Sequence, residues 1–432
     1  MNANASVTSE NPPATQQYRR LWRWHFYAAF LVIPFIVWQG ITGVIYLWHE
    51  DLADALWPQL RLVEARAANA SLDQQLTVIR QNIGAAMPAT LIVKADPRRS
   101  TQWVFDESNG LHSAAFVDPH TGKFLGSVSA NTWLPGLTRE LHGGWPLGKP
   151  GSWLLELGDG WCIVMVLTGL YLWWPRSRQG LAGVLYPRLR AGARIFWKDI
   201  HAVIGFWFSL IFLSFLFTAL PWTDFWGNHL LKPIQRLTGQ GVPAALGIDH
   251  AAMHMAMPDG MAMAPIALQD ILDTARREGL DGDLEIRLRS GDAPIQVTMK
   301  TARAADERTL QIDRFHGEVL ARVGWNDYPA IPKLVATGVD LHEGTFFGTA
   351  NRIFNTVVVA ALLWLVVTGL IGWYRRRPGK VLSAPPPQLT RMPRWLKGVA
   401  LGLCVFMPLL GASVLLLWLL DALVKLAVWQ RA

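Results

Sequence analysis

The sequence LHGGWPLGKPGSWLLELGDGWCIVMVLTGLYLW, residues 141–173, decides how this chain is organised, because much of it occurs a second time. The second copy, residues 341–373, keeps the Leu-His pair, two glycines, the late Thr-Gly-Leu and the final Trp, all at an offset of 200 residues. An internal repeat determines architecture before any local motif is considered. It also predicts that the histidines of the two copies form equivalent pairs.

The composition is that of a membrane protein. Apolar residues make up 51% of the 432 residues, and many of the 22 tryptophans flank long apolar runs. Tryptophan rings settle where a membrane meets water. Five of these runs are long enough to cross a bilayer as helices, which need about 20 residues. We therefore expect about five transmembrane helices in contact with membrane lipid.

The net charge of +8 lies mainly beside the apolar runs. Segment 175–200 carries six basic residues and one acid, and segment 375–397 carries seven basic residues and no acid. Short basic connections beside spans are typical of cytoplasmic loops, and a nucleic-acid-binding surface is not expected. The pattern favours a bacterial inner (cytoplasmic) membrane protein with a cytoplasmic N-terminus and large periplasmic segments.

The chain is expected to be an α+β membrane protein with a duplicated (helix, external α+β domain, helix) arrangement and one extra C-terminal helix. Strand-like runs at 90–94, 102–106 and 113–117 recur in the second half at 283–288, 294–300 and 308–313. In order, the expected segments are a disordered cytoplasmic tail (1–18), a first span (19–49), a periplasmic domain (50–150), a second span (151–175), a cytoplasmic basic loop (176–198), a third span (199–222), a second periplasmic domain (223–349), a fourth span (350–374), a cytoplasmic linker (375–394), a fifth span (395–421) and a tail (422–432).

Four histidines recur by repeat position and are the candidate cofactor ligands. His25 and His201 lie at the cytoplasmic ends of the first and third spans, and His142 and His342 lie just outside the periplasmic ends of the second and fourth. Similar halves pack about a pseudo-twofold axis, so equivalent residues can face each other. Two imidazoles at one level of a helical bundle can hold a non-covalent b-type haem. The alternative is that these histidines cap helices or sit in an interface.

Other residues near the histidines are weaker candidates. His49, at the outer end of the first span, has no repeat partner and is either an alternative outer ligand or an interfacial residue. Glu156 and Asp159, early in the second span, face either the outer site or the interface. Candidate partners for haem propionates are Arg20, Arg194, Arg352 and Lys149. Small residues that mark close helix or cofactor approach are Gly40, Gly43, Gly169, Gly205 and Gly369.

A methionine- and histidine-rich segment, residues 250–263, interrupts the second external region. Its possible copper or substrate contacts are Met253, His254, Met255, Met257, Met261 and Met263. Thioether and imidazole ligands suit Cu(I), whereas flexible methionines also make adaptable apolar surfaces. Copper contact, substrate docking and an inert loop all remain open.

Several motifs are missing from the sequence. There is no G-x-G-x-x-G after a strand, and two cysteines are too few for an ordinary iron–sulfur cluster. There is no C-x-x-C-H for covalent haem either. Electrons must therefore come from elsewhere, either from a quinol or from a cytoplasmic reductase.

The chain resembles the PepSY-associated transmembrane-helix family. The resemblance rests on TGVIYLW (42–48), DPHTG (118–122), LHGG (141–144) and TGLYLWWPR (168–176), and it covers about residues 20–376. It implies that the two external domains are PepSY-like. Within the family the chain resembles FoxB-type inner-membrane ferrisiderophore reductases, which use b-type haems to pass electrons to ferric chelates in the periplasm.

The resemblance implies a haem-dependent metalloreductase with two b-type haems, held by His25 with His201 and by His142 with His342. Its periplasmic substrate would be a ferric siderophore, reduced by outer-sphere electron transfer without a catalytic acid, base or nucleophile. Two alternatives differ in class. One is a periplasmic cupric reductase or copper-handling protein that uses the methionine-rich segment; the other is a membrane-anchored PepSY binding or chaperone module without a cofactor.

Overall fold

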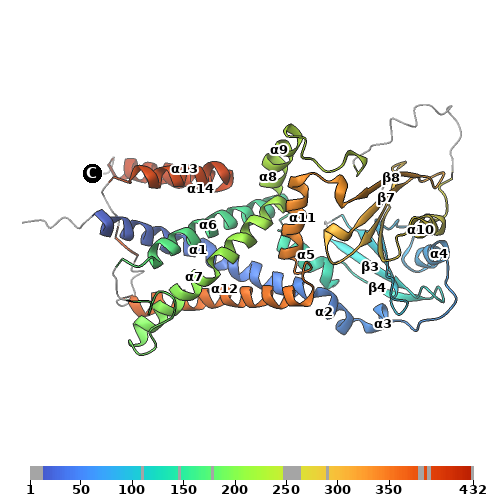
Figure 1. Cartoon of the computed structure of the whole chain (residues 1–432), viewed down its shortest axis with the longest axis horizontal. Coiled ribbons are helices and arrows are strands. Elements are labelled where there is room, and N and C mark those ends of the chain that lie inside the picture. The colour runs from blue at the N-terminus through green and yellow to red at the C-terminus, as the bar shows by residue number, and fades with distance from the viewer. Residues whose placement is uncertain are drawn as a thin grey trace, which may run out of the picture. The chain divides into compact units, whose positions relative to one another are not determined.

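The computed structural model of the chain describes residues 13–108, 111–144, 147–176, 180–246, 264–288, 291–377, 384–386 and 391–429. The chain divides into two compact units (Figure 1). The first, called the helical unit here, contains Met1–Ile41, Lys149–Asn228 and Thr356–Ala432. The second, called the sheet unit, contains Thr42–Gly148 and His229–Asn355.

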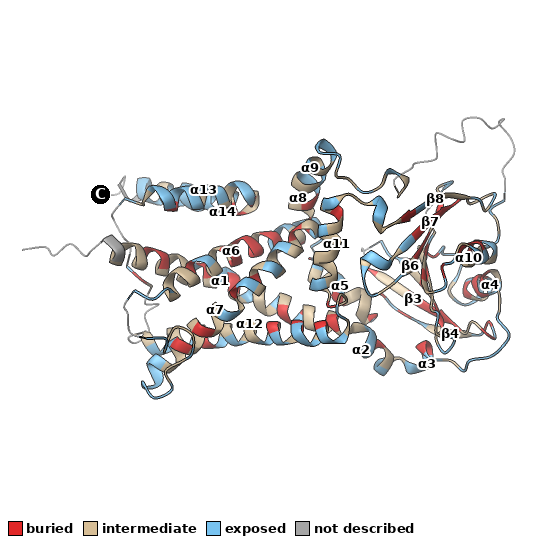
Figure 2. Cartoon of the chain, viewed as in Figure 1, coloured by how far each residue is buried: buried red, intermediate tan, exposed pale blue. Residues whose placement is uncertain are grey.

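Five helices among the described residues are long and apolar enough to cross a membrane. They lie in α1 (Pro13–Leu47), α6 (Lys149–Trp173), α7 (Ala193–Ala219) with the 3-10 turn that follows it (Leu220–Trp222), α12 (Thr349–Arg376) and α14 (Pro408–Trp429). Large apolar side chains are exposed along them, including Leu210 at 76% and most of α14 (Figure 2). Exposed apolar area costs about 25 cal/mol per Å² in water, and lipid tails remove that cost. The chain is therefore an α+β membrane protein, as the composition predicts.

The single helix expected over residues 395–421 is two helices, α13 (Arg394–Phe406) and α14. Met407 separates them with φ −118° and ψ 84°, outside the helical region. Pro408 follows it, and a proline pushes the preceding residue out of the helical conformation. Continuous apolar composition conceals this break, so the structure assigns the fifth candidate span to Pro408–Leu426 alone.

The sheet unit combines eight strands with short helices. The helices of the sheet unit are α2 (His49–Leu56), α3 (Pro58–Arg61), α4 (Leu72–Ile83), α5 (Leu134–Gly143), α9 (Lys232–Leu237), α10 (Leu268–Arg277) and α11 (Ala330–His342). The short helix α8 (Asp224–Trp226) belongs to the helical unit. The strands are β1 (Thr90–Val93), β2 (Thr101–Asp106), β3 (His112–Val117), β4 (Phe124–Val128), β5 (Asp283–Arg287), β6 (Ile295–Lys300), β7 (Arg308–Ile312) and β8 (Val319–Gly324).

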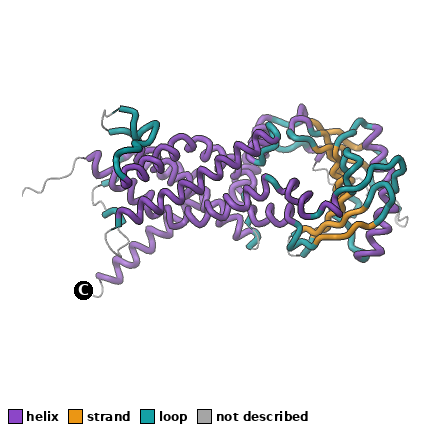
Figure 3. The backbone as a smooth tube through the Cα atoms, turned by 90° about the horizontal axis from the view of Figure 1, so that it is seen from below, coloured by secondary structure: helices purple, strands orange, loops and turns teal. Residues whose placement is uncertain are grey.

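All eight strands form one antiparallel sheet in the order β4-β3-β2-β1-β5-β6-β7-β8. Figure 3 shows the strands side by side in orange. The central pair joins the two halves of the sequence, with Leu91 of β1 opposite Ile286 of β5. Regions 50–150 and 223–349, expected as two domains, thus contribute four strands each to a common sheet. Pairing β1 with β5 satisfies backbone groups that would be exposed edges in two separate sheets.

One hydrophobic core lies between the sheet and helices α4 and α10 (Figure 1). It contains Trp103 of β2, Ile286 of β5, Ile79 of α4 and Ile271 of α10, all at most 1% exposed. Because side chains alternate between sheet faces, Phe116 points instead into a second cluster with Trp133. Both halves of the sequence therefore supply the same main core.

The two core helices are also linked at their N-termini. The Asp73 carboxylate of α4 accepts hydrogen bonds from the backbone N–H groups of Leu268 (2.9 Å) and Gln269 (3.0 Å), which begin α10. In return, the Gln269 side-chain oxygen accepts a hydrogen bond from the Leu72 N–H at 3.1 Å. A carboxylate is favourable at a helix N-terminus, where backbone donors are unsatisfied.

A matching turn precedes the last strand of each half. Asp118 Oδ1 accepts a hydrogen bond from the His120 N–H at 2.8 Å, and Asp313 Oδ1 accepts one from the Phe315 N–H at 2.9 Å. Gly122 and Gly317 then adopt φ of 69° and 72°, which favours glycine. The DPHTG motif is therefore a turn. The strands that follow the two turns, β4 and β8, lie beyond the three strand-like runs that the sequence pattern predicts in each half.

Candidate functional site: two histidine pairs

His25 and His201 meet within the helical unit. His25 lies on α1 and His201 on α7, and their ring centroids are 6.4 Å apart with the ring planes at 86°. Each ring is partly buried. The two residues that the repeat makes equivalent are therefore brought together.

The Nδ1 atoms of this pair have equivalent partners. His25 Nδ1 lies 3.1 Å from both the Met165 carbonyl oxygen and the Thr168 hydroxyl on α6. His201 Nδ1 lies 3.2 Å from the Leu365 carbonyl oxygen and 3.1 Å from the Thr368 hydroxyl on α12. A backbone carbonyl can only accept, so Nδ1 carries the proton in each ring. This tautomer leaves the Nε2 lone pair available to a metal.

His142 and His342 meet within the sheet unit. Their ring centroids are also 6.4 Å apart, with the planes at 66°. His142 Nδ1 lies 3.0 Å from the Thr42 hydroxyl. Burial lowers the pKa of His142 to about 4, so the imidazole is neutral at physiological pH, the form that binds metals.

Glycines allow the close approach of three of these rings. A Cβ atom on Gly169 would lie 3.3 Å from His25 Cε1, and one on Gly369 would lie 3.3 Å from His201 Cε1. One on Gly43 would lie 3.1 Å from His142 Cε1. The other two span glycines serve helix packing, since Gly40 faces Val359 and Leu363, and Gly205 has Leu365 at 3.8 Å.

The separation within each pair fits two imidazoles bound to one metal ion. Metal–imidazole nitrogen bonds are about 2.0–2.1 Å long. A five-membered ring with bonds near 1.35 Å places each nitrogen about 1.15 Å from the centroid. Two rings on opposite sides of one ion therefore have centroids about 6.3–6.5 Å apart, and both observed pairs are at 6.4 Å.

Each pair supplies two ligands. Within the residues that the structure describes, no group of three or more His, Cys, Asp or Glu side chains is arranged to hold a metal ion. A haem would supply its own nitrogen ligands and would take two further ligands from the protein. The donor set of each pair therefore fits a haem iron.

Two asparagines that the sequence analysis missed hold the end of α11. Asn355 Nδ2 donates to the carbonyl oxygens of Leu341 and His342, both at 2.9 Å. Asn351 Nδ2 donates to the Asn355 side-chain oxygen at 3.0 Å. Both asparagines are at most 6% exposed, so they fix the backbone that carries His342. Their only sequence signal was two amides near the start of an apolar span.

The structure gives His49 other partners. Its Nδ1 lies 2.5 Å from the Tyr46 carbonyl oxygen, and its ring stacks on Tyr46 with centroids 4.6 Å apart. Its Nε2 lies 3.5 Å from the Glu50 carboxylate. Both ring nitrogens are therefore engaged next to its own helix. These contacts favour the interfacial reading over the alternative-ligand reading.

The basic residues near the pairs differ in their surroundings. Arg352 is paired with Asp51 at 2.5 Å and lies over the Trp48 ring, so it has a local counterion. Arg20 is buried and donates to the Gln17 side chain at 2.8 Å. Arg376, which the sequence analysis did not single out, lies over the rings of Trp22 and Phe26. Trp22 and Phe26 belong to α1, the helix that carries His25.

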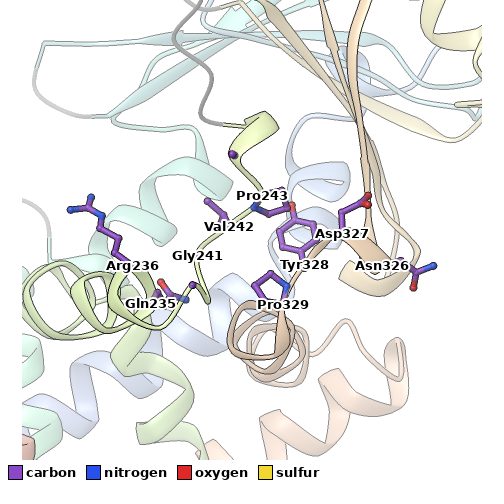
Figure 4. Close-up of a pocket in the computed structure, with 11 residues that line it drawn as sticks. Gln235, Arg236, Gly241, Val242, Pro243, Asn326, Asp327, Tyr328 and Pro329 are labelled. Carbon is purple, nitrogen blue, oxygen red and sulfur yellow. The ribbon is translucent and has the colours of Figure 1, made fainter.

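An open pocket of about 660 Å³ lies on the surface of the sheet unit (Figure 4). Gln235 and Arg236 of α9 line one side, and Asp327, Tyr328 and Pro329, just before α11, line the other. The volume is within the range of small-molecule sites, about 300–1,000 Å³. The methionine-rich segment 250–263 lies outside the described residues, so its candidate contacts are not placed.

Fold and site together define a class: a membrane protein with long apolar helices, an eight-stranded antiparallel sheet and two histidine pairs. The chain belongs to the family of the PepSY-associated TM region, whose profile matches residues 22–376. A comparison with curated proteins finds no match.

Proposed function

We propose that this chain is a di-haem electron-transfer protein of the bacterial inner membrane that reduces ferric siderophore complexes at the periplasmic face. In this proposal the two halves are a duplicated arrangement of helix, PepSY-like region and helix. The basic connections 176–198 and 375–394 are cytoplasmic, and the sheet unit is periplasmic. The FoxB-type resemblance supplies the choice of a ferric siderophore as substrate.

The observation that carries the proposal is the equal 6.4 Å separation within both histidine pairs. His25 with His201 would hold one haem, and His142 with His342 the other. Nearby groups support this use: the Met165 and Leu365 carbonyls fix the ring tautomers of the first pair, and Thr42 contacts Nδ1 of His142. When bound, haem supplies one-electron transfer.

The residues of the chain have three tasks in this function. They supply the imidazoles, they orient the rings of His25, His201 and His142 through contacts at Nδ1, and they leave room beside these three rings at Gly169, Gly369 and Gly43. Hydrogen bonds to metal-ligating histidines raise their basicity and tune the potential of the metal. No general acid, base or nucleophile is required for outer-sphere reduction.

The substrate would be a ferric chelate with hard oxygen ligands. Fe(II) matches such ligands less well than Fe(III), so addition of one electron promotes release of the metal. The cavity beside α9 offers a docking place of suitable volume, with Arg236 as a cation for an anionic chelate. The electron donor would be a quinol or a cytoplasmic reductase.

Reoxidation of the pre-reduced protein by a ferric siderophore tests this function. The purified full-length protein is reduced without oxygen and mixed with ferrioxamine, ferric citrate or a Cu(II) salt, while the haem absorbance and Fe(II) formation are followed. We expect ferric siderophore to reoxidise the protein and yield one Fe(II) per electron, more slowly in His342→Ala. His49→Ala is the control and should behave as wild type.

Two outcomes contradict the proposal. Fast reoxidation by Cu(II) alone would assign the protein to copper instead. A protein that folds without a Soret band would be a binding module rather than a reductase.

A further inference from the structure

Helix α6 carries two carboxyl groups inside its membrane-spanning length. Glu156 is 0% exposed and Asp159 is 5% exposed. They lie about 10 and 15 Å along the helix from its first residue, Lys149, at 1.5 Å per residue. Ionisable residues at membrane depth are rare, and they usually mark a functional site. The histidine pairs do not use these two.

Glu156 is held as a hydrogen-bond acceptor. Its Oε2 accepts a hydrogen bond from the Thr223 hydroxyl at 2.8 Å and another from the Trp226 backbone N–H at 2.8 Å. Donors of this kind favour the charged form of a carboxyl group. The Trp226 ring then donates through Nε1 to the Phe406 carbonyl oxygen at 3.0 Å. The Glu156 site is thus connected to the break between α13 and α14.

Asp159 lies one helical turn further on and has a different environment. Throughout the described part of the chain, no side chain or backbone group forms a hydrogen bond or ion pair with its carboxyl group. It interacts electrostatically with Glu156. The adjacent Gly160 packs on Leu410 and Met407, where the cluster of Ile163 and Leu220 is apolar. Without donors and in apolar surroundings, a carboxyl group favours its neutral, protonated form.

Glu156 and Asp159 are both carboxyl groups, but their surroundings favour different protonation states. A pair of close carboxyls cannot both be charged in a medium of low dielectric constant, so one proton is retained between them. We propose that Glu156 and Asp159 form a proton-binding site in the membrane-spanning part, with Glu156 as the fixed carboxylate and Asp159 as the carrier of one exchangeable proton.

Few other titratable groups face this site. Cys162 lies on α6 itself, Asp224 of α8 accepts a hydrogen bond from Trp153, and Cys404 lies on α13. On α14, the packed residues Leu410 and Ser413 carry no charge. His25 of α1 contacts α6 at Met165, about 9 Å further along the helix. The proton site does not depend on the proposed haems, although it could balance charge when an electron enters the bundle.

Dicyclohexylcarbodiimide labelling tests the site, because this apolar reagent reacts with protonated carboxyl groups inside membranes. The purified full-length protein in lipid vesicles is labelled between about pH 5 and pH 9, and adducts are located by peptide mass spectrometry. We expect an adduct on Asp159 that decreases as pH rises and is absent in Asp159→Asn. The Glu156→Gln variant lacks the neighbouring negative charge, so Asp159 should lose its proton more easily. Its labelling should therefore decrease at a lower pH than in the wild type.

Asp224→Asn is the matched control and should label Asp159 as wild type does. An adduct on Glu156 instead of Asp159, no adduct at any pH, or labelling that does not change with pH would overturn the proposal. Protection by excess NaCl over choline chloride would also overturn it, because that result identifies a sodium site. A water-soluble carbodiimide on wild-type protein keeps the test valid if a variant fails to fold, since it should leave Asp159 unlabelled.

Discussion

The hydroxyl oxygen of Thr168 lies 3.1 Å from Nδ1 of His25, and the same distance separates Thr368 from His201. Each threonine hydroxyl also donates to a carbonyl one turn earlier in its own helix, Thr168 to Val164 at 2.7 Å and Thr368 to Trp364 at 2.9 Å. The hydroxyl can therefore accept the Nδ1 proton while its own proton is engaged. The late Thr-Gly of the repeat thus supplies both a hydrogen bond and space beside one imidazole.

Replacing Thr168 by valine should weaken the hold on His25 while keeping the shape of the side chain. We expect a higher midpoint potential at one haem and up to about 10-fold weaker haem retention. The loss of affinity should be at the low end of the range for partners of metal ligands, because His25 Nδ1 keeps its contact with the Met165 carbonyl. Redox titration of the purified protein measures this. Ser214→Ala is the control, since Ser214 donates only to the Ile211 carbonyl. Equal potentials in wild type and Thr168→Val would contradict the role of the hydroxyl.

Gly369→Val should displace the His201 ring, because a Cβ at this position would meet Cε1 at 3.3 Å. Loss of about one of two haems per chain is expected. Gly372 provides a matched control on the same helix, since a Cβ there meets nothing within 4 Å. Haem quantification against protein concentration compares the two variants. If Gly372→Val lost as much haem as Gly369→Val, Gly369 would have no specific steric role beside His201.

Ile286→Ala should destabilise both halves of the sheet unit. Ile286 is 1% exposed in the shared core, and such truncations cost about 2–5 kcal/mol. Hydrogen exchange should quicken in β1–β3 as well as in β5–β7, because β1 pairs directly with β5. The exposed Ile234→Ala serves as control. Faster exchange confined to β5–β8 would indicate two independent domains.

Asp54→Asn should lower the stability of the sheet unit at neutral pH. Burial alone raises the pKa of Asp54, but its hydrogen bonds with Arg99 (2.6 Å) and Arg61 (2.5 Å) outweigh burial and lower the pKa. A carboxyl group whose pKa is lowered by folding stabilises the folded state at pH values above its ordinary pKa. This contribution is lost as the pH falls through the pKa of the folded state. We expect a loss of about 1 kcal/mol at pH 7, modest because the side chain is partly exposed.

Thermal unfolding at neutral pH and near pH 3 checks the effect of Asp54. The difference in stability between wild type and Asp54→Asn should narrow at the lower pH, because unfolding of the wild type is then accompanied by proton uptake at Asp54. Glu64→Gln, at a side chain that is 88% exposed, should change little at either pH. A gap of constant size at both values would mean that the ion pairs with Arg61 and Arg99 do not carry the effect.

The repeat made much of this structure predictable. The strand-like runs predicted at 90–94, 102–106 and 113–117 correspond to β1, β2 and β3, and their counterparts in the second half correspond to β5, β6 and β7. The repeat also predicted that His25 and His201 form a pair, and their ring centroids lie 6.4 Å apart. These features depend on local periodicity or on the internal repeat, both of which are visible in one chain.

Other features depend on contacts that no local pattern encodes. Asn355 holds His342 through backbone carbonyls of another helix, and the pairing of β1 with β5 joins strands that lie far apart in sequence. The break at Met407 was hidden because the residues on either side are uniformly apolar. Asp159 was expected to face either the outer site or the interface, and its low exposure of 5% could not be read from the sequence.

Haem content per chain is the most direct test of the central claim that each histidine pair holds one haem. A dithionite-reduced minus oxidised spectrum with haem quantification is recorded for wild type, His201→Ala, His342→Ala and the double variant. We expect two haems, one, one and none, with His49→Ala retaining both. Full haem content in both single variants, or a wild-type preparation without Soret absorption, would contradict the account.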